Sequence, residues 1–140
     1  TFDIDLARSQ SADNPVYYIQ YAHARVCSIF RKLKSENLSW DKEQAQASLS
    51  KLELESEKEI MVKIGRFPEV VNLAASNHEP HVIANYLRDL AGDFHAWYNN
   101  EKTLVEDTEL RNARLALAEA VRIVINNGLD LLGVSAPAEM

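Results

Sequence analysis

The chain has 140 residues, 46% of them hydrophobic, and a formal net charge of −6. This length supports one domain with its own core, and no apolar run approaches the roughly 20 residues that span a bilayer. The single cysteine, Cys27, excludes an internal disulfide and a multi-cysteine zinc site, while the acidic balance by itself argues against nucleic acid as a partner.

The N-terminal segment TFDIDLARSQ has no cationic region followed by an apolar run, so it is not a signal peptide. It also lacks an initiator methionine, which fits a fragment of a longer chain. We expect a cytoplasmic protein without a membrane partner. Apolar residues recur at spacings of three and four along the chain, and there are few glycines and prolines for sheet turns. The predicted fold is therefore all-α, a helical bundle over residues 14–140.

The first predicted helix begins at Pro15, because Asp13 and Asn14 are capping residues and proline suits the first helical position. A charged stretch over residues 34–37 should end it. One half of its surface is an apolar stripe that should face the core: Val16, Ile19, Ala22, Val26, Ile29, Phe30 and Leu33.

The other half of this helix is aromatic at its start and cationic toward its end, through Tyr17, Tyr21, Arg25, Ser28 and Lys32. Tyrosine and arginine planes hold unpaired RNA bases by stacking, at about 1–3 kcal/mol per base. The alternative is that the tyrosines pack against a neighbouring helix with their hydroxyls at the rim. Periodicity leaves both interpretations open.

Charges are segregated along the chain. This weakens the argument that the negative net charge makes against a nucleic-acid partner. Residues 15–34 contain four basic side chains and no acid, whereas residues 36–59 contain seven acids and three lysines. A local positive surface acts over a Debye length of about 8 Å whatever the total charge is.

The middle of the chain predicts shorter elements. Residues 39–58 are polar and should form one or two short helices, whose carboxylates should lie on a solvated face. Residues 69–76 should form a short helix after Phe67 and Pro68.

Two longer helices follow. The first should run from His81 to about Tyr98, and the second from about Glu109 to Asn127, with Gly128 as the residue that ends it. Leu115 and Ile123 lie opposite the main apolar stripe of that last helix, so we expect it to be buried on more than one face. The apolar tail after it should pack back on the bundle.

No catalytic or metal site emerges from the spacing of chemically active residues. His23 lies beside the apolar stripe and is expected to be a hydrogen-bonded core histidine, and Cys27 is expected to be buried. His78 and His81 flank a turn without further ligands at a suitable spacing. We expect no metal, no cofactor and no catalytic residue in this chain.

Several segments in a fixed order resemble the anticodon-binding domain of arginyl-tRNA synthetase. They are DLARSQSADNP, NPVYYIQYAHARVCSI, GRFPEVVNLAA, EPHVIANYLRDLAGDFHAWYN and ARLALAEAVRIVINNGLDLLGVSAP. Together they cover nearly the whole chain, and residues 36–58 are the least diagnostic part.

The resemblance implies an all-helical domain that docks beside the anticodon stem-loop of tRNA-Arg. In that family a separate class I catalytic domain of Rossmann type ligates arginine to tRNA-Arg with ATP and magnesium. Its His-Ile-Gly-His and Lys-Met-Ser-Lys type signatures are absent here. The chain is thus expected to be the C-terminal piece of an arginine–tRNA ligase, with residues 1–13 as the connection from the catalytic domain, residues 14–140 as the bundle, and no activity alone. The partners implied are tRNA-Arg and that catalytic domain, in an enzyme that is mostly monomeric.

The resemblance also implies site residues. It places Tyr18 or Tyr21, together with Tyr98 and Met140, near the anticodon loop, where arginine anticodons share a central cytosine. Two arginines are expected to be phosphate contacts or buried organisers, with both roles open: Arg25 and Arg114.

One departure is that the family commonly ends in Glu-Arg-Met, whereas this chain ends Ala138-Glu139-Met140. An acid thus replaces a cation that could meet phosphate. The acidic balance and the apolar tail also permit a second function, a helical protein-interaction or structural domain without RNA binding. A stand-alone enzyme is the least supported alternative.

Overall fold

Six α-helices and one short 3-10 helix make up residues 14–140, the part of the chain that the computed structural model describes. No strand occurs among these residues, so the all-α prediction is confirmed for them. In chain order the elements are α2 (Pro15–Ser35), α3 (Lys42–Ala47), η1 (Leu49–Lys51), α4 (Glu55–Gly65), α5 (Phe67–Asn77), α6 (His81–Asn100) and α7 (Thr108–Leu131).

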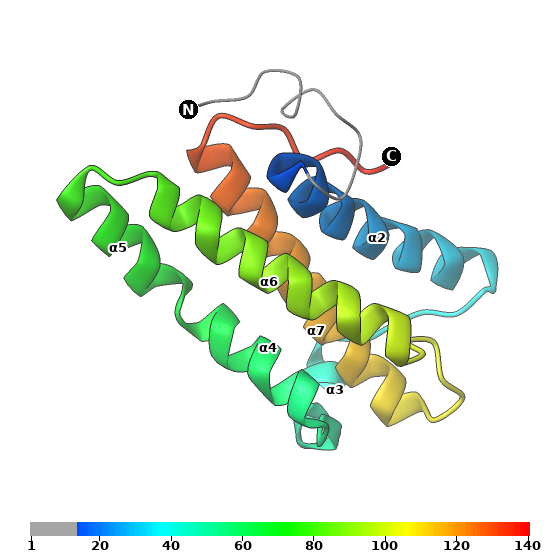
Figure 1. The fold of residues 1–140 in the computed structure, drawn as a ribbon. Coiled ribbons are helices and arrows are strands. Elements are labelled where there is room, and N and C mark those ends of the chain that lie inside the picture. The colour runs from blue at the N-terminus through cyan, green and yellow to red at the C-terminus, as the bar shows by residue number, and fades with distance from the viewer. Residues whose placement is uncertain (1–13) are drawn as a thin grey trace.

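Helix α6 lies at the centre of the bundle. Figure 1 shows α2 and α7 along one side of α6 and the consecutive helices α4 and α5 along the other, while α3 packs against α7. Helices α2 and α6 run in the same direction and α7 runs in the opposite one. Burying a large aliphatic or aromatic side chain contributes about 1.5–3 kcal/mol, and the core contains many, the largest of them Trp97, Phe94, Ile19, Ile60, Leu87, Leu90, Leu115, Ile125 and Leu129.

Helix α2 forms as its sequence predicts. The Asn14 side chain accepts hydrogen bonds from the backbone N–H groups of Val16 (3.1 Å) and Tyr17 (3.4 Å), and Pro15 is the first helical residue. The helix ends at Ser35, followed by Asn37 in the left-handed region (φ 59°). Most of the predicted apolar stripe is buried: Ile19, Ala22, Val26, Ile29 and Leu33. Asp13, the other predicted cap, lies outside the described residues.

The acidic segment differs from its prediction at one carboxylate. Glu55 is exposed as expected, but Glu57 is fully buried, so the solvated-face prediction is wrong for it. The Glu57 carboxylate accepts from the indole N–H of Trp97 (3.1 Å), from Nε of Arg114 (3.0 Å) and from the backbone N–H of Leu54 (3.2 Å). A buried charge with this many donors avoids most of the cost of desolvation.

The last helix also differs from its prediction. Helix α7 continues through Gly128 to Leu131, and the glycine with a left-handed backbone is Gly133 (φ 74°). Gly128 instead faces α6, where an added Cβ would lie 2.7 Å from both Cδ atoms of Leu87. Ile123 is 41% exposed, so the two-faced burial predicted for α7 is wrong at that position, although Leu115 is fully buried.

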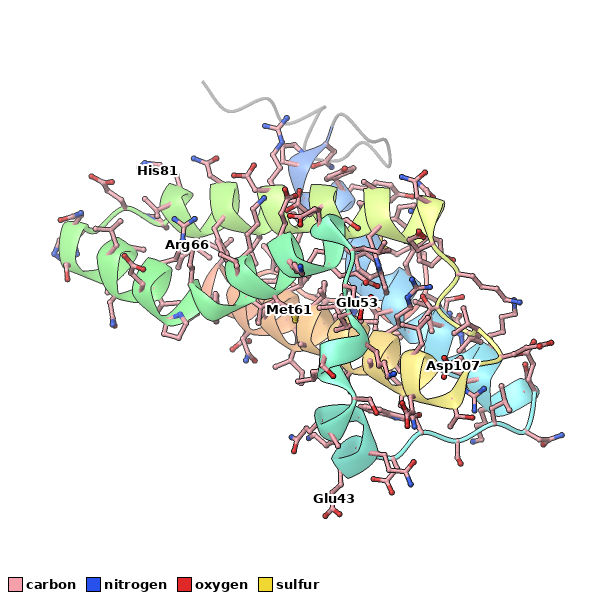
Figure 2. The ribbon with its side chains drawn as sticks, turned by 90° about the horizontal axis from the view of Figure 1, so that it is seen from below. Glu43, Glu53, Met61, Arg66, His81 and Asp107 are labelled. Atoms are coloured by element: carbon pink, nitrogen blue, oxygen red, sulfur yellow. The ribbon has the colours of Figure 1, made fainter. Side chains whose placement is uncertain are left out.

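The lower face of the bundle is formed by α3, α4 and α7. Figure 2 shows it from below, with Met61 of α4 beside α7 and Glu43 projecting from α3 away from the bundle. A groove of about 270 Å³ lies there, lined mainly by apolar side chains that include Trp40, Leu49, Met61, Ile64 and Ile123. None of the helices in residues 14–140 is long and apolar enough to cross a membrane.

Candidate nucleic-acid interface

A hollow of about 390 Å³ lies where α2, the end of α6 and the C-terminal tail meet. Its lining combines two aromatic rings, two guanidinium groups and a thioether with one carboxylate. The lining residues are Tyr21, Ala24, Arg25, Ser28, Arg31, Tyr98, Glu139 and Met140. Four of the site residues proposed from the sequence therefore meet here, from three segments that are far apart in the chain: Tyr21, Arg25, Tyr98 and Met140.

Arg25 is held between two tyrosine rings. Its Cζ atom lies 4.5 Å from the ring centroid of Tyr21 and 4.5 Å from that of Tyr98. Cation–π contacts of this kind contribute about 0.5–1 kcal/mol at exposed sites and more when desolvated. No carboxylate of residues 14–140 forms an ion pair with Arg25. A guanidinium suits phosphate and base edges because its donors form a rigid planar fork.

His95 binds the edge of the Arg25 guanidinium. The Arg25 NH1 group lies 3.0 Å from Nδ1 of His95, and Nε2 of His95 lies 3.1 Å from the carbonyl oxygen of Tyr18. Because a guanidinium only donates and a carbonyl only accepts, the ring is neutral with its proton on Nε2. Burial lowers the pKa of His95, the hydrogen bond to the Tyr18 carbonyl opposes this, and the charge of Arg25 lowers the pKa further.

The aromatic surface continues along α2 from the hollow. The rings of Tyr17 and Tyr21 stack with centroids 6.1 Å apart and planes 17° apart. Tyr18 lies on the other side of His95, with ring centroids 4.6 Å apart. It lines a different hollow beside Gly92 and the ion pair of Lys63 and Asp93. Of the two tyrosines that the resemblance left open, Tyr21 is the one that faces Arg25 in the hollow.

The C-terminal tail is held along α2 by three backbone carbonyls, so the prediction that it packs back on the bundle is confirmed (Figure 1). Gln20 donates to Ser135 O (2.8 Å), Nδ1 of His23 donates to Pro137 O (2.9 Å), and Arg31 donates to Ala138 O (3.0 Å). His23 is 5% exposed, which confirms it as a hydrogen-bonded core histidine. These bonds bring Glu139 and Met140 to the hollow, where Met140 is 48% exposed.

A second hollow of about 230 Å³ adjoins the first and shares Ser28 and Tyr98 with it. Its lining adds Lys32 and Lys102, together with Glu101. The two hollows form one surface with aromatic groups at its centre and cations on both sides of Tyr98. Aromatic platforms in a cationic groove are the combination that binds single-stranded nucleic acid.

Arg114 lies elsewhere, in the core between α4, α6 and α7. It is 8% exposed, its Nε donates to Glu57 and its NH1 donates to the carbonyl oxygen of Lys102 (2.7 Å). The last of these bonds anchors the loop that carries Lys102 to the second hollow. Of the two roles left open for Arg114, this geometry favours the buried organiser.

Two groups of residues were missed in the sequence. His95 stands three positions before Tyr98, on the same face of α6, so its proximity to the tyrosine could have been found from helical spacing. The side chains that hold the tail, such as Gln20 and Arg31, act on residues more than a hundred positions away, and no local pattern identifies such pairs. Cys27, predicted to be buried, is only half-buried. Within residues 14–140 no group of three or more His, Cys, Asp and Glu side chains could hold a metal ion.

Comparison with known proteins gives a consistent set of matches. The family model described as the DALR anticodon binding domain matches residues 19–140. An arginine–tRNA ligase from Coxiella burnetii is 56% identical over 139 residues, and one from Thioalkalivibrio sulfidiphilus is 59% identical over 139 residues. The solved arginyl-tRNA synthetase of Thermus thermophilus superimposes with a TM-score of 0.81 at 34% identity.

These matches cover the chain almost entirely but only part of each relative. In both ligases the alignment takes in 99% of this chain and 24% of the relative. In the Thermus thermophilus structure it takes in 99% of this chain and 23% of the other. The chain thus spans about a quarter of the length of the relatives that it matches.

Proposed function

This chain belongs to the DALR anticodon binding domain family, and on that premise we propose that it binds tRNA-Arg through the anticodon loop. The observation that carries the proposal is the position of Arg25, unpaired with any described carboxylate and sandwiched between Tyr21 and Tyr98. The family places anticodon recognition in this kind of domain, and the hollow offers the surfaces that such recognition needs.

The proposed contacts follow from the chemistry of the hollow. Splayed anticodon bases stack on the exposed parts of the tyrosine rings, and Met140 supplies a polarizable thioether beside them. Arg25 donates to a base edge or a phosphate from its fixed position. The two lysines of the second hollow, Lys32 and Lys102, meet the backbone of the loop. Tyr17 extends the stack, and Tyr18 supports it from behind His95.

We propose further that the chain is one part of an arginine–tRNA ligase of class I. The two ligases named above are about four times as long as the aligned segment, since it takes in 24% of each. In that proposal the remaining part of the polypeptide holds ATP and magnesium and attaches arginine, in a mostly monomeric cytoplasmic enzyme. The chain described here contributes RNA binding and no chemical step.

Mapping the bound surface by NMR tests the proposal. Adding tRNA-Arg should shift the resonances of Tyr21, Arg25, Tyr98 and Met140 and leave those of Met61 and Ile123, in the groove on the lower face, unchanged. The second candidate, a protein-interaction domain without RNA binding, predicts no shift at the hollow. Shifts absent there, or confined to the lower face, would contradict the proposal.

A further inference from the structure

Arg25 would not hold its position through the tyrosines alone. Two aromatic faces fix the plane of a guanidinium, but they leave it free to slide and turn within that plane, because the attraction of a ring for a cation is not directional in the way a hydrogen bond is. The bond from Arg25 to Nδ1 of His95 (3.0 Å) is the directional contact within the described part of the chain. It fixes which edge of the guanidinium faces the protein and which faces the hollow.

His95 can serve this purpose because its own orientation is fixed. It is 6% exposed, Nε2 is bonded to the Tyr18 carbonyl (3.1 Å), and its ring packs between those of Tyr18 (4.6 Å) and Tyr21 (5.5 Å). The Tyr18 carbonyl belongs to the backbone of α2, the helix that also carries Arg25. His95 of α6 is therefore bonded to two residues of α2, Tyr18 and Arg25.

We propose that His95 is a positioning residue, which as the neutral ring with its proton on Nε2 holds Arg25 between Tyr21 and Tyr98 for RNA recognition. The recognition half rests on the proposed function, whereas the positioning half concerns this chain alone. A neutral histidine is suited to this position because it accepts from a cation and donates to a carbonyl at once. An imidazolium donates from both nitrogens and would turn a donor toward Arg25.

Protonation of His95 should therefore release Arg25. The groups that face the ring are, from α2, the Arg25 guanidinium and the hydroxyl-bearing rings of Tyr18 and Tyr21, and from α6 the uncharged ring of Phe94. Burial first, and then Arg25, keep the pKa of His95 below its ordinary value near 6.5. The unfolded chain therefore binds a proton at His95 more tightly than the folded chain does. The stability that the neutral ring contributes is complete above the ordinary pKa of 6.5, and it is lost as the pH falls from 6.5 toward the lowered pKa of the folded state.

Two variants separate positioning from packing. His95→Gln keeps an acceptor and a donor but cannot be protonated in this pH range, whereas His95→Leu fills the space with neither. His81→Gln, at the exposed first position of the same helix, is the matched control. The readouts are the tautomer of His95 and the order of the Arg25 side chain, both by ¹⁵N NMR on the free chain, followed by affinity for tRNA-Arg.

We expect His95 of the wild type to be the Nε2–H tautomer. Arg25 should be ordered in the wild type, in His95→Gln and in His81→Gln. In His95→Leu it should be mobile, and the affinity for tRNA-Arg should be at least about fivefold weaker. Acidification should mobilise Arg25 together with protonation of His95 in the wild type and not in His95→Gln. The proposal is overturned by an Arg25 that stays ordered in folded His95→Leu or beside a protonated His95. If no form binds RNA while Arg25 behaves as expected, the proposed function fails and the positioning role stands.

Discussion

Glu57 of α4 and Arg114 of α7 form an ion pair in the core, with 3.0 Å between Oε2 and Nε and side chains only 1% and 10% exposed. The same carboxylate accepts from Trp97 of α6, so three helices meet at one buried charge. Through its bond to the Lys102 carbonyl, Arg114 extends this connection to the loop beside the candidate site. The loop that carries Lys102 to the site is therefore bonded to the core of the bundle, although Arg114 itself does not face the hollow.

Glu57→Ala should be among the most destabilising single changes in the chain. Removing one partner of a buried pair leaves an uncompensated charge and costs about 3–5 kcal/mol. Glu55→Ala, two positions earlier on α4 and exposed, should change the free energy of unfolding by less than about 0.5 kcal/mol. Chemical denaturation of both variants measures the difference. Equal, small effects would show that the charge is not buried as described.

Tyr98→Ala should cost more RNA affinity than stability. The ring is half-buried and its contacts include Phe94 (centroids 5.9 Å) and Arg25, so its removal loses one stacking surface and one wall of the sandwich. The expected loss of binding is about 1–3 kcal/mol. Tyr86→Ala is the control, because Tyr86 packs on Phe67 away from the hollow. It should lower the melting temperature without changing affinity. Comparable losses of melting temperature and affinity in Tyr98→Ala would mark it as chiefly a core residue.

Gly128→Ala tests the packing of α7 against α6. An added methyl group would lie 2.7 Å from both Cδ atoms of the fully buried Leu87, and overpacking of this kind costs about 1–3 kcal/mol. Gly65→Ala, at the end of α4, meets nothing within 4 Å and should be neutral or slightly stabilising. Thermal unfolding of the pair measures the cost of the added methyl group. A neutral Gly128→Ala would contradict the close packing of Gly128 against Leu87.

Glu139→Arg should strengthen RNA binding. Glu139 lines the hollow beside Arg25 and Arg31, where its negative charge opposes a phosphate. Replacing it by a cation should steepen the dependence of log K on log salt by about one unit if one further phosphate is contacted. Glu53→Arg makes the same change in net charge at an exposed residue of the lower face (Figure 2) and should leave the slope nearly unaltered. Equal responses of the two variants would show that only the total charge matters.

Features that depend on neighbouring residues in the chain could be predicted from the sequence. The cap at Asn14, proline at the first helical position and the apolar stripe of α2 are short-range signals, and they appear in the structure as predicted except at Val16, which is exposed. The burial of Glu57 could not be predicted, because two of its three donors, Trp97 and Arg114, lie far away in the chain on α6 and α7. The packing of Gly128 against Leu87 could not be predicted either, since the two residues lie on different helices.

In the candidate site, too, features within one helix could be predicted, whereas contacts between helices could not. The stripe of Tyr17, Tyr21 and Arg25 follows from helical periodicity, and Tyr98 came from a family resemblance. What periodicity could not show is that Tyr98 closes over Arg25 from another helix, or that His95 stands behind it. Those contacts join positions that are about 70 residues apart in the chain, since Arg25 and His95 differ by 70.

A low-salt binding titration of this chain with tRNA-Arg, beside the same tRNA with its central anticodon cytosine replaced, tests anticodon recognition most directly. Low salt is needed because the net charge of −6 opposes RNA and the phosphate contacts are screened. We expect a clear preference for the unaltered tRNA, and loss of that preference in Tyr21→Ala and Tyr98→Ala. Equal binding of the two tRNAs, or none, would contradict the claim that these residues read the anticodon.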